Sequence, residues 1–595
     1  MTQHAPPRPS ILHGSLITLL LLTVLFAVPP ARGQTRIQPP ALPAELGDGV
    51  YVNANIHTAD PDRPRAASFA VSRGEIVAVG SEREVIKAID PLGLADILRI
   101  DLGGRTVLPG LIDAHCHLAG LGALHVGVID LAGTTSYEQV IERVEARAAE
   151  TPKGEWVLGH GWDNESWDNP EDQKALPTHD ALSEAVPDHP VWIARVDGHA
   201  TLANRAAMDT ADISPETRSP EGGEMLRRDD GTLTGVFVDN AGSLMERAIP
   251  AGARGDPESM IRAAQRACLS AGLTGVHDMG VHPATAELYR DLSERGILKL
   301  RVHAACPSAF AIKHFEQNPP YRSERFSFAG AKAYIDGAMG SRGAWLLAPY
   351  ADRPAYTEGD RAGEPYTGLS VQEPAFIEAL ARHGLEKGYQ VFTHAIGDRG
   401  NREVLDAYER AAKSTGHDLS AARFRVEHAQ LLSPADIPRF ASLGVIASMQ
   451  PTHCTSDMRW VEDRVGEQRA AGAYAWASLL RTGAVIAGGS DFPVESHNPF
   501  LGIYAAVTRQ NAESSPERGW RPEERMTRTE VLRSMTIHAA HSAFMDGFTG
   551  SITPGKRADF IVIDRDIMTC DPSEILGTRV LRTVIDGEQV YSSDG

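Results

Sequence analysis

The chain is poor in cysteine and carries fewer basic than acidic residues. Only five of its 595 residues are cysteine, and no two of them form a Cys-x-x-Cys pair. An odd count leaves at least one thiol free, so most of the five are expected to be buried and unpaired. Lysine and arginine number 58 against 78 aspartate and glutamate, a formal net charge of −20. That balance argues against nucleic acid or an anionic membrane as the main partner.

Long apolar runs are lacking apart from one near the N-terminus. Ser15 to Val28 is apolar but shorter than the roughly 20 residues that span a bilayer. Arg8 precedes it in a stretch without acidic residues, and Ala31-Arg32-Gly33 places small residues at −3 and −1 of a cleavage site. We interpret residues 1–33 as a signal peptide, with an uncleaved anchor as the alternative, and expect a periplasmic or secreted protein without a membrane span. No cysteine follows the run, which disfavours a lipoprotein.

The rest of the chain has no convincing internal repeat, and its composition changes along its length. Residues 34–46 are proline-rich and are interpreted as a disordered lead-in. Short strand-like segments broken by turn residues fill 47–107 and 541–595. Between them, in 108–540, apolar strand-like runs alternate with helical patterns. The stretch of about 118–253 is too long for one connection between strands, so we interpret it as an insertion.

Eight apolar runs of the middle segment predict the strands of a parallel α/β barrel. They end near His117, His277, His303, Asp336, His394, His428, Gln450 and Asp491. A (β/α)₈, or TIM, barrel gathers its active site at the C-terminal ends of its strands. Most of these ends carry polar or ionisable residues, as that architecture requires.

The first of these runs, LPGLIDAHCH, ends in a His-x-His pair. Residues i and i+2 of a strand point to the same face, so His115 and His117 would present two imidazoles to one metal ion. Imidazole suits Zn, Fe, Ni or Cu. Such a pair is often incidental when it stands alone, and its interpretation depends on the residues at the other strand ends.

Four other runs supply potential partners for that pair. His394 and His428 each follow an apolar run, and Asp491 ends a run in a glycine-rich turn. Lys332 lies inside an apolar strand, where an unpaired ammonium would be costly. Each has an ordinary alternative: a hydrogen-bonded core histidine, a turn-forming aspartate, or a lysine paired with a carboxylate such as Asp336. The ordered set nevertheless predicts a metal centre.

These segments together resemble the amidohydrolase superfamily, and more closely its YtcJ-like, or amidohydrolase-3, branch, which includes N-substituted formamide deformylase. The resemblance extends from about Gly49 to Val590. It implies a TIM barrel and a β-sandwich that is built from both chain ends. The segments that carry it are LPGLIDAHCH, WVLGHGWDNESW, RVDGHATLANRAAM, GLTGVHDMG, AKAYIDGAMGSRGAW, THAIGDRGN, FRVEHAQL, GGSDFPVESHNPF and SITPGKRADFIVID.

The resemblance further implies that six side chains hold one or two divalent metal ions, with zinc as the first choice: His115, His117, Lys332, His394, His428 and Asp491. The first two would bind the more buried ion, and His394 and His428 the second. Lys332 would be N6-carboxylated, which turns its cation into a bridging carbamate. Asp491 would bind metal and transfer the proton.

The implied activity is hydrolysis of a carbon–nitrogen bond other than a peptide bond by metal-activated water, in an amide, formamide or N-acyl small molecule. His199 is a catalytic candidate that would hydrogen-bond the substrate or the tetrahedral oxygen. His160 and Trp162 are candidates for the substrate pocket, and Arg342 for contact with an anionic substrate group. The alternative for each is a structural role in a turn, in packing or at the barrel rim.

Three other functions are compatible with such a barrel. A mononuclear deaminase of the same fold would usually lack a lysine equivalent to Lys332, and an ester or lactone hydrolase would keep the site. A non-catalytic exported binding protein would be expected to have lost ligands. Metallo-β-lactamase chemistry is excluded because the chain has no HxHxDH run. The family resemblance is compatible with a homodimer.

Overall fold

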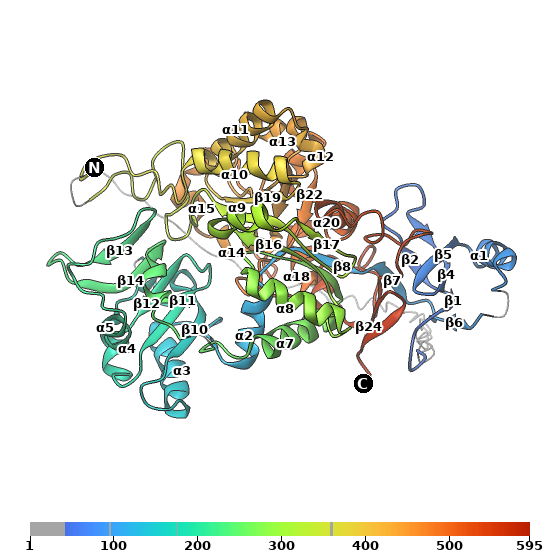
Figure 1. Ribbon diagram of the computed structural model, residues 1–595, viewed down its shortest axis with the longest axis horizontal. Coiled ribbons are helices and arrows are strands. Elements are labelled where there is room, and N and C mark those ends of the chain that lie inside the picture. The colour runs from blue at the N-terminus through green and yellow to red at the C-terminus, as the bar shows by residue number, and fades with distance from the viewer. Residues whose placement is uncertain (1–41, 95–96, 175, 251, 358–360, 595) are drawn as a thin grey trace, which may run out of the picture. The chain divides into compact units, whose positions relative to one another are not determined.

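A computed structural model describes residues 42–94, 97–174, 176–250, 252–357 and 361–594 (Figure 1). The predicted signal peptide, residues 1–33, and most of the proline-rich segment lie outside the described residues. Within the described ranges, no helix is both long enough and apolar enough to span a bilayer.

Eight parallel strands form the central sheet in the order β22-β21-β20-β19-β18-β16-β15-β8. They are β8 (Leu111–Cys116), β15 (Leu273–Asp278), β16 (Arg301–Pro307), β18 (Phe326–Tyr334), β19 (Gln390–Ala395), β20 (Arg425–His428), β21 (Ile446–Met449) and β22 (Ile486–Gly488). Each predicted strand end falls on or next to one of them, although His303 lies in the middle of β16. A short strand, β17 (Tyr321–Arg322), adds to β18 in the antiparallel sense.

The barrel closes between its first and last strands. The backbone N–H of Asp491 donates to the His115 carbonyl at 2.7 Å, and that of His117 donates to the Phe492 carbonyl at 2.8 Å. Cys116 and Phe492 form a parallel bridge between the same segments. These contacts join β8 to the residues after β22, so the predicted TIM-like barrel is confirmed.

Helices between the strands bury one apolar face against the barrel, as α10 (Pro374–Lys387) illustrates. A proline at its first position suits the helix start, and Gly388 with a φ of 78° ends it in the left-handed conformation. Its buried residues recur at helical spacing: Ile377, Leu380, Ala381, Gly384 and Leu385. The next helix, α11 (Asp398–Thr415), packs beside it in Figure 1.

The residues between β8 and α7 (Pro257–Ser270) form a separate six-stranded sheet. Its order is β13-β14-β12-β11-β10-β9, with β9 (Ile129–Asp130), β10 (Val157–Trp162), β11 (Val191–Arg195), β12 (Ala200–Ala203), β13 (Gly223–Arg227) and β14 (Leu233–Asp239). Helices α3 (Tyr137–Glu150) and α4 (His179–Ala185) share a hydrophobic core with one face of this sheet. The other face packs with residues of α2 (Leu118–Val126) and α7.

Two further sheets contain strands from the N-terminal and C-terminal parts of the chain. One has the order β5-β4-β1-β6 and the other β25-β24-β23-β7-β2-β3. Their strands are β1 (Gly49–Val52), β2 (Asn55–His57), β3 (Arg65–Ala66), β4 (Ser68–Ser72), β5 (Glu75–Gly80), β6 (Arg99–Asp101), β7 (Thr106–Pro109), β23 (Phe560–Ile563), β24 (Val580–Ile585) and β25 (Glu588–Ser592). Tyr51 stacks on Phe69 at 4.5 Å, and Phe560 meets Tyr51 edge-on at 5.2 Å.

The described end of the proline-rich lead-in also contacts these sheets. Leu46 is 3% exposed, and its backbone N–H donates to Gln589 Oε1 at 3.2 Å. Residues 42–46, predicted as part of a disordered lead-in, therefore pack against the C-terminal strands. Apolar contacts of Leu42 and Leu46 with the core of the two sheets account for this difference.

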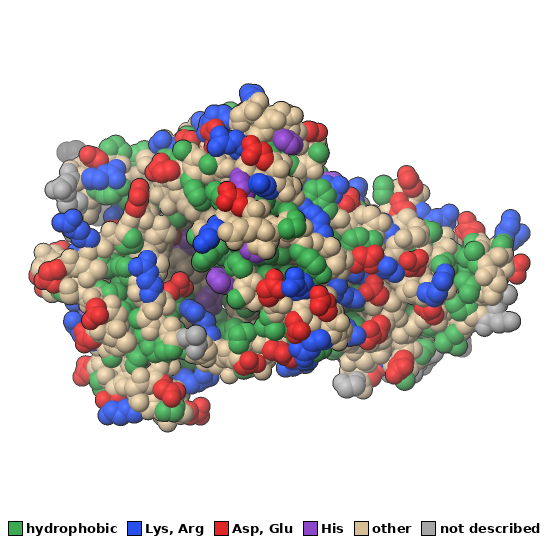
Figure 2. Space-filling model, viewed as in Figure 1, with side chains coloured by type: hydrophobic (Ala, Val, Ile, Leu, Met, Phe, Trp, Pro, Cys, Tyr) green, Lys and Arg blue, Asp and Glu red, His purple; other side chains and the backbone are tan. Residues whose placement is uncertain are grey.

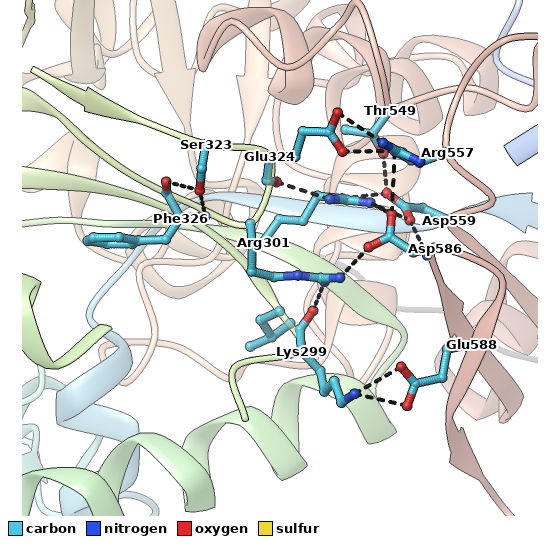
Figure 3. Close-up of polar contacts among 12 residues, drawn as sticks. Lys299, Arg301, Ser323, Glu324, Phe326, Thr549, Arg557, Asp559, Asp586 and Glu588 are labelled. Carbon is cyan, nitrogen blue, oxygen red and sulfur yellow. Dashed lines mark hydrogen bonds and ion pairs between the residues drawn. The ribbon is translucent and has the colours of Figure 1, made fainter. Parts of the chain in front are cut away.

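A buried ion pair links the barrel to the C-terminal strands (Figure 3). Arg301 on β16 binds both carboxylate oxygens of Asp559, at 2.7 and 2.9 Å, and both side chains are 1% exposed. The backbone N–H of Asp586 donates to Asp559 at 2.9 Å, and the Asp586 carboxylate contacts Arg301 and Arg325. Removing one partner of such a pair leaves the other charge buried without compensation.

Replacing Arg301 with Met is expected to lower the free energy of unfolding by about 3–5 kcal/mol, because Asp559 stays buried without its cation. Urea denaturation measures the change. Lys299→Met is the control, because Lys299 pairs with the exposed Glu588 and its loss should cost about 1 kcal/mol or less. Equal destabilisation by both substitutions would contradict this account.

Candidate metal centre

Three of the predicted ligand histidines meet a hydrogen-bond acceptor at their Nδ1 atoms. The acceptors are Glu427 for His115 at 2.5 Å, the Met279 carbonyl for His117 at 3.1 Å, and Gln450 for His428 at 2.9 Å. An acceptor at Nδ1 makes that nitrogen the donor and leaves the Nε2 lone pair free. Histidines that bind metals have this second contact, which fixes their tautomer and orientation.

Two of these Nε2 atoms approach the Asp491 carboxylate. Oδ1 of Asp491 lies 3.4 Å from His115 Nε2 and 3.2 Å from His117 Nε2. Ligand atoms of His115, His428 and Asp491 all lie within 4.8 Å of one another. Asp491 Oδ1 and His394 Nε2 are buried without a hydrogen-bond partner among the described residues. Buried polar atoms rarely stay unpaired, and a cation would satisfy this donor set of imidazoles and a carboxylate.

The remaining predicted ligands line the same cavity. The His394 ring lies 4.5 Å from that of His428. Lys332 is 1% exposed, with Nζ 3.3 Å from His115 Nε2 and 4.9 Å from the centre of the Tyr334 ring. All six predicted ligand residues are thus brought together at one end of the barrel.

The suggested pairing of Lys332 with Asp336 is wrong. In the described part of the chain, no carboxylate lies within 4.0 Å of Lys332 Nζ. Asp336 instead accepts three backbone hydrogen bonds of 2.8 to 3.0 Å, from Trp345, Ile396 and Gly397. It therefore holds the loops after β18 and β19 in place.

The protonation states of the site suit a bound cation. Burial lowers the pKa of His115 to about 4 and those of His394 and His428 well below the usual value, so these imidazoles are neutral at neutral pH. Burial opposes the ionised form of Asp491, but the neighbouring His115 and His117 hold the pKa of its carboxyl well below its usual range. Neutral imidazoles and an ionised carboxylate are the forms that coordinate metals.

Two of the candidate ligand residues have left-handed backbone conformations. The φ angle is 72° at His428 and 64° at Asp491. Adjacent strand residues normally point to opposite faces. The left-handed turn at His428 ends β20, so that Glu427 and His428 both contact His115. Such strained positions concentrate at functional sites.

The sequence interpretation missed a buried ion pair behind His115. Arg425 is fully buried and binds Glu427 through Nε at 2.7 Å and Nη2 at 2.9 Å. Although burial opposes ionisation, Arg425 and His115 hold the pKa of Glu427 well below its usual range. The available sequence signal was a pair of opposite charges at i and i+2, Arg425 and Glu427, in an otherwise apolar strand. Residues at this spacing lie on one strand face, so the two side chains can pair.

The insertion contributes His199, whose Nδ1 lies 2.6 Å from Asp239 Oδ1. The His199 ring is 4.9 Å from that of His394. A Cβ on Gly337 or Gly343 would come within 2.6 or 2.8 Å of Asp239 Oδ2, so both glycines make room for this carboxylate. No sequence pattern pointed to Asp239, which lies 40 residues after His199 along the chain.

The three residues predicted to bind substrate have different surroundings. His160 lines the cavity beside the ligand residues. Trp162 lies in the core of the insertion, and its indole N–H donates to the Ile193 carbonyl at 3.2 Å. A register shift between His160 and Trp162, with Gly161 at a φ of 109°, accounts for their different faces. Arg342 binds Asp352 at 2.8 Å and lies outside the cavities at the ligand residues.

Two cavities meet at the candidate ligand residues. The larger, about 560 Å³, lies between the barrel and the insertion sheet, and the smaller is about 80 Å³. His199, His394, His428 and Asp491 line both. In Figure 2, histidine side chains are visible in the hollow between the insertion and the barrel. A substrate positioned at Asp491 could therefore extend into both spaces.

The barrel carries its polar residues at the C-terminal strand ends, where TIM-barrel enzymes have their active sites. A model of the amidohydrolase family matches residues 99–591, most of the chain. The chain therefore belongs to the amidohydrolase family, and its resemblance to the YtcJ-like branch is confirmed.

Several curated proteins are similar over nearly the whole chain. Protein LONG AFTER FAR-RED 3 of Arabidopsis thaliana is 32% identical, with 93% of each chain covered. The putative amidohydrolase YtcJ of Bacillus subtilis is 31% identical over 90% of this chain and 98% of its own. N-substituted formamide deformylase of Arthrobacter pascens is 29% identical over 93% and 99%. A solved structure from Pyrococcus horikoshii, described as an uncharacterised metal-dependent hydrolase, is 25% identical with a TM-score of 0.69, covering 88% of this chain and 99% of its own.

Replacing Glu427 with Gln is expected to weaken zinc binding about 10- to 100-fold, because the charge that orients His115 and increases its basicity is lost. Competition with a chromogenic chelator measures the affinity. Glu524→Gln is the control, since Glu524 is also buried but binds Ser478. Unchanged zinc affinity in the Glu427 variant would show that His115 is not held for coordination.

Proposed function

We propose that the protein hydrolyses a carbon–nitrogen bond other than a peptide bond in a small molecule, of the amide, formamide or N-acyl class. One observation carries the proposal: the Nε2 atoms of His115 and His117 approach Oδ1 of an ionised Asp491, and this Oδ1 and His394 Nε2 have no hydrogen-bond partner among the described residues. The similarity to an N-substituted formamide deformylase supports the substrate class.

We propose that one or two divalent ions, with zinc as the preferred metal, are held by His115, His117, His394, His428, Asp491 and an N6-carboxylated Lys332. When bound there, the metal acts as a Lewis acid toward the substrate carbonyl and makes water a stronger nucleophile at neutral pH.

Carboxylation of Lys332 is supported by the burial of its amine. Burial lowers the pKa of Lys332 to about 8, so part of the amine is neutral near neutral pH. The neutral nitrogen can bond to the carbon of CO₂ and lose a proton, which gives a carbamate anion. This change replaces a buried ammonium by an anionic ligand, and it removes the cost of burying that cation without a partner.

Asp491 is the proposed proton carrier. Its ionised carboxylate takes a proton from the attacking water while the water oxygen bonds to the carbonyl carbon. The same carboxyl then returns the proton to the nitrogen as the carbon–nitrogen bond breaks, which releases an acid and an amine. The depressed pKa of Asp491 keeps it in the accepting form at neutral pH.

His199 is proposed to stabilise the carbonyl oxygen as negative charge develops on it. Burial opposes its protonation, but the hydrogen bond to Asp239 and the charge of that carboxylate raise the pKa of His199. Because Asp239 accepts from Nδ1 at 2.6 Å, the protonated ring has its Nε2–H free as a donor. A preorganised donor of this kind stabilises the transition state more than the ground state.

Asp491→Asn is expected to lower kcat/KM for N-substituted formamides and acetamides by about 10²- to 10⁴-fold, because Asn cannot accept the proton. Amine release measures turnover, and circular dichroism checks folding. Asp436→Asn, at a buried aspartate on the outer side of the barrel, is the control. Near wild-type turnover in the Asp491 variant would refute the proposed role. If the wild-type protein hydrolyses only cyclic amidines, esters or lactones, the deaminase or esterase alternative is supported instead. If it binds such compounds without turnover, the non-catalytic alternative is supported.

We also propose that residues 1–33 direct export, and that the mature protein acts on a small molecule in the periplasm or outside the cell, as a homodimer. The apolar run and the small residues Ala31 and Gly33 support cleavage after Gly33. Edman sequencing of protein expressed with this segment should begin at Gln34, and light scattering should give twice the chain mass. An N-terminus that retains the apolar run would contradict cleavage.

A further inference from the structure

Tyr334 ends β18 at the rim of the barrel and lines the larger cavity. It stands two residues after Lys332 on the same strand, so both side chains point to one strand face. Lys332 Nζ lies 4.9 Å from the centre of the Tyr334 ring, and the centre of the His394 ring lies 5.4 Å from it. The backbone N–H of Tyr334 donates to Gln372 Oε1 at 2.9 Å, which fixes the strand end. The phenol is therefore held beside the proposed metal centre.

The hydroxyl of Tyr334 differs from other polar groups around this cavity because it has no protein partner. Asp239 binds His199 at 2.6 Å, and the Ser243 hydroxyl donates to the Asn240 carbonyl at 2.7 Å. The described residues offer the Tyr334 hydroxyl no hydrogen bond, and its oxygen is not enclosed by protein, so it is open to the cavity. A free hydroxyl in this position can bind a polar group of a ligand.

The orientation of the ring directs the hydroxyl away from Lys332. Nζ of Lys332 lies over the face of the ring, whereas a phenol hydroxyl lies at the ring edge and in the ring plane. The hydroxyl therefore does not face the lysine amine. A ligand in the cavity is the partner that remains for it.

The charges around Tyr334 define the kind of group it can bind. Burial and the carboxylates of Asp491 and Glu246 raise the pKa of Tyr334, so the phenol keeps its proton at neutral pH and can donate a hydrogen bond. The same carboxylates repel an anion. An uncharged oxygen acceptor therefore suits this hydroxyl best.

We infer that Tyr334 is a specificity-determining residue whose O–H donates to an uncharged oxygen acceptor of the substrate, such as an ether, hydroxyl or carbonyl oxygen. Because the ring lies beside His394 and Lys332, the acceptor lies within a few bonds of the amide that reacts. This inference rests on the proposed hydrolysis of amides and specifies the substrate of the same site.

Two pairs of isosteric amides test the inference, one pair for each side of the reacting bond. N-(2-methoxyethyl)formamide and N-butylformamide differ in the leaving amine, and N-methyl-2-methoxyacetamide and N-methylbutanamide differ in the acyl group. Each pair exchanges one ether oxygen for a methylene. In at least one pair, Tyr334→Phe should lower the ether-to-alkyl ratio of kcat/KM by about 5-fold or more, because only the ether compound loses a hydrogen bond. An unchanged ratio in both pairs would overturn the inference.

A charged analogue tests whether the acceptor is uncharged. In 3-formamidopropanoate a carboxylate replaces the ether of the methoxyethyl compound. The wild type should hydrolyse it with a lower kcat/KM than the ether compound, because nearby carboxylates repel it. The reverse order, if it depends on the Tyr334 hydroxyl, would overturn the assignment of an uncharged acceptor.

Tyr321→Phe is the matched control. Tyr321 lies on β17, which pairs with β18, and its side chain is also partly buried. It lies outside both cavities at the candidate ligand residues, so its loss should leave both ratios unchanged. Zinc content, measured by elemental analysis, checks the metal centre. If Tyr334→Phe lost zinc and hydrolysed all four amides more slowly by the same factor, the hydroxyl would support the metal centre and the inference would be wrong.

Failure of the inference can be distinguished from failure of the proposed function. If the wild type hydrolyses none of these amides, titrations of the zinc-loaded protein followed by saturation-transfer NMR still compare the affinities of the ether and alkyl compounds. Binding of an ether compound about 5-fold tighter than its alkyl partner by the wild type, but not by Tyr334→Phe, would support the inference without turnover. Equal affinities, or no binding of either compound, would overturn it.

Discussion

The closure of the barrel between β8 and the residues after β22 is the constraint on which the site depends. The hydrogen bond of 2.7 Å from the Asp491 N–H to the His115 carbonyl places the proposed base beside the first ligand strand, although most of the barrel separates them in sequence. Because all eight strands are parallel, their C-terminal ends share one rim, and His394 and His428 reach the same point. An open sheet could not bring both edges together.

Buried charge behind the rim then sets the orientation of His115. Burying Arg425 and Glu427 in the barrel costs desolvation free energy, which their mutual attraction offsets. The pair places an ionised acceptor 2.5 Å from His115 Nδ1, which an apolar barrel could not do. The insertion repeats this arrangement, since Asp239 orients His199 at 2.6 Å. Each half of the site therefore contains an imidazole fixed by a buried carboxylate.

The barrel and the candidate ligand positions could be predicted from the sequence, because both depend on local pattern. Strands buried on both faces read as continuous apolar runs, and ligands stand out where such runs end. Asp239 meets His199 from a distant part of the chain, so no local pattern revealed it. The opposite charges of Arg425 and Glu427 on one strand face were a local signal, but the contact of Glu427 with His115 joins segments far apart in sequence. For Trp162 the structure agrees with the packing alternative: regular alternation would put it beside His160, but the irregularity at Gly161 turns it into the insertion core.

The central claim is that the barrel end holds a metal ion through the Nε2 atoms of its histidines. Anomalous diffraction from crystals grown with zinc, recorded on both sides of the zinc absorption edge, tests it most directly. The account predicts a peak about 2.0–2.2 Å from His115 Nε2 and from an Asp491 oxygen, with electron density for a carboxyl group on Lys332 Nζ. A fully occupied zinc peak elsewhere with none at Asp491, or coordination through the Nδ1 atoms, would contradict it.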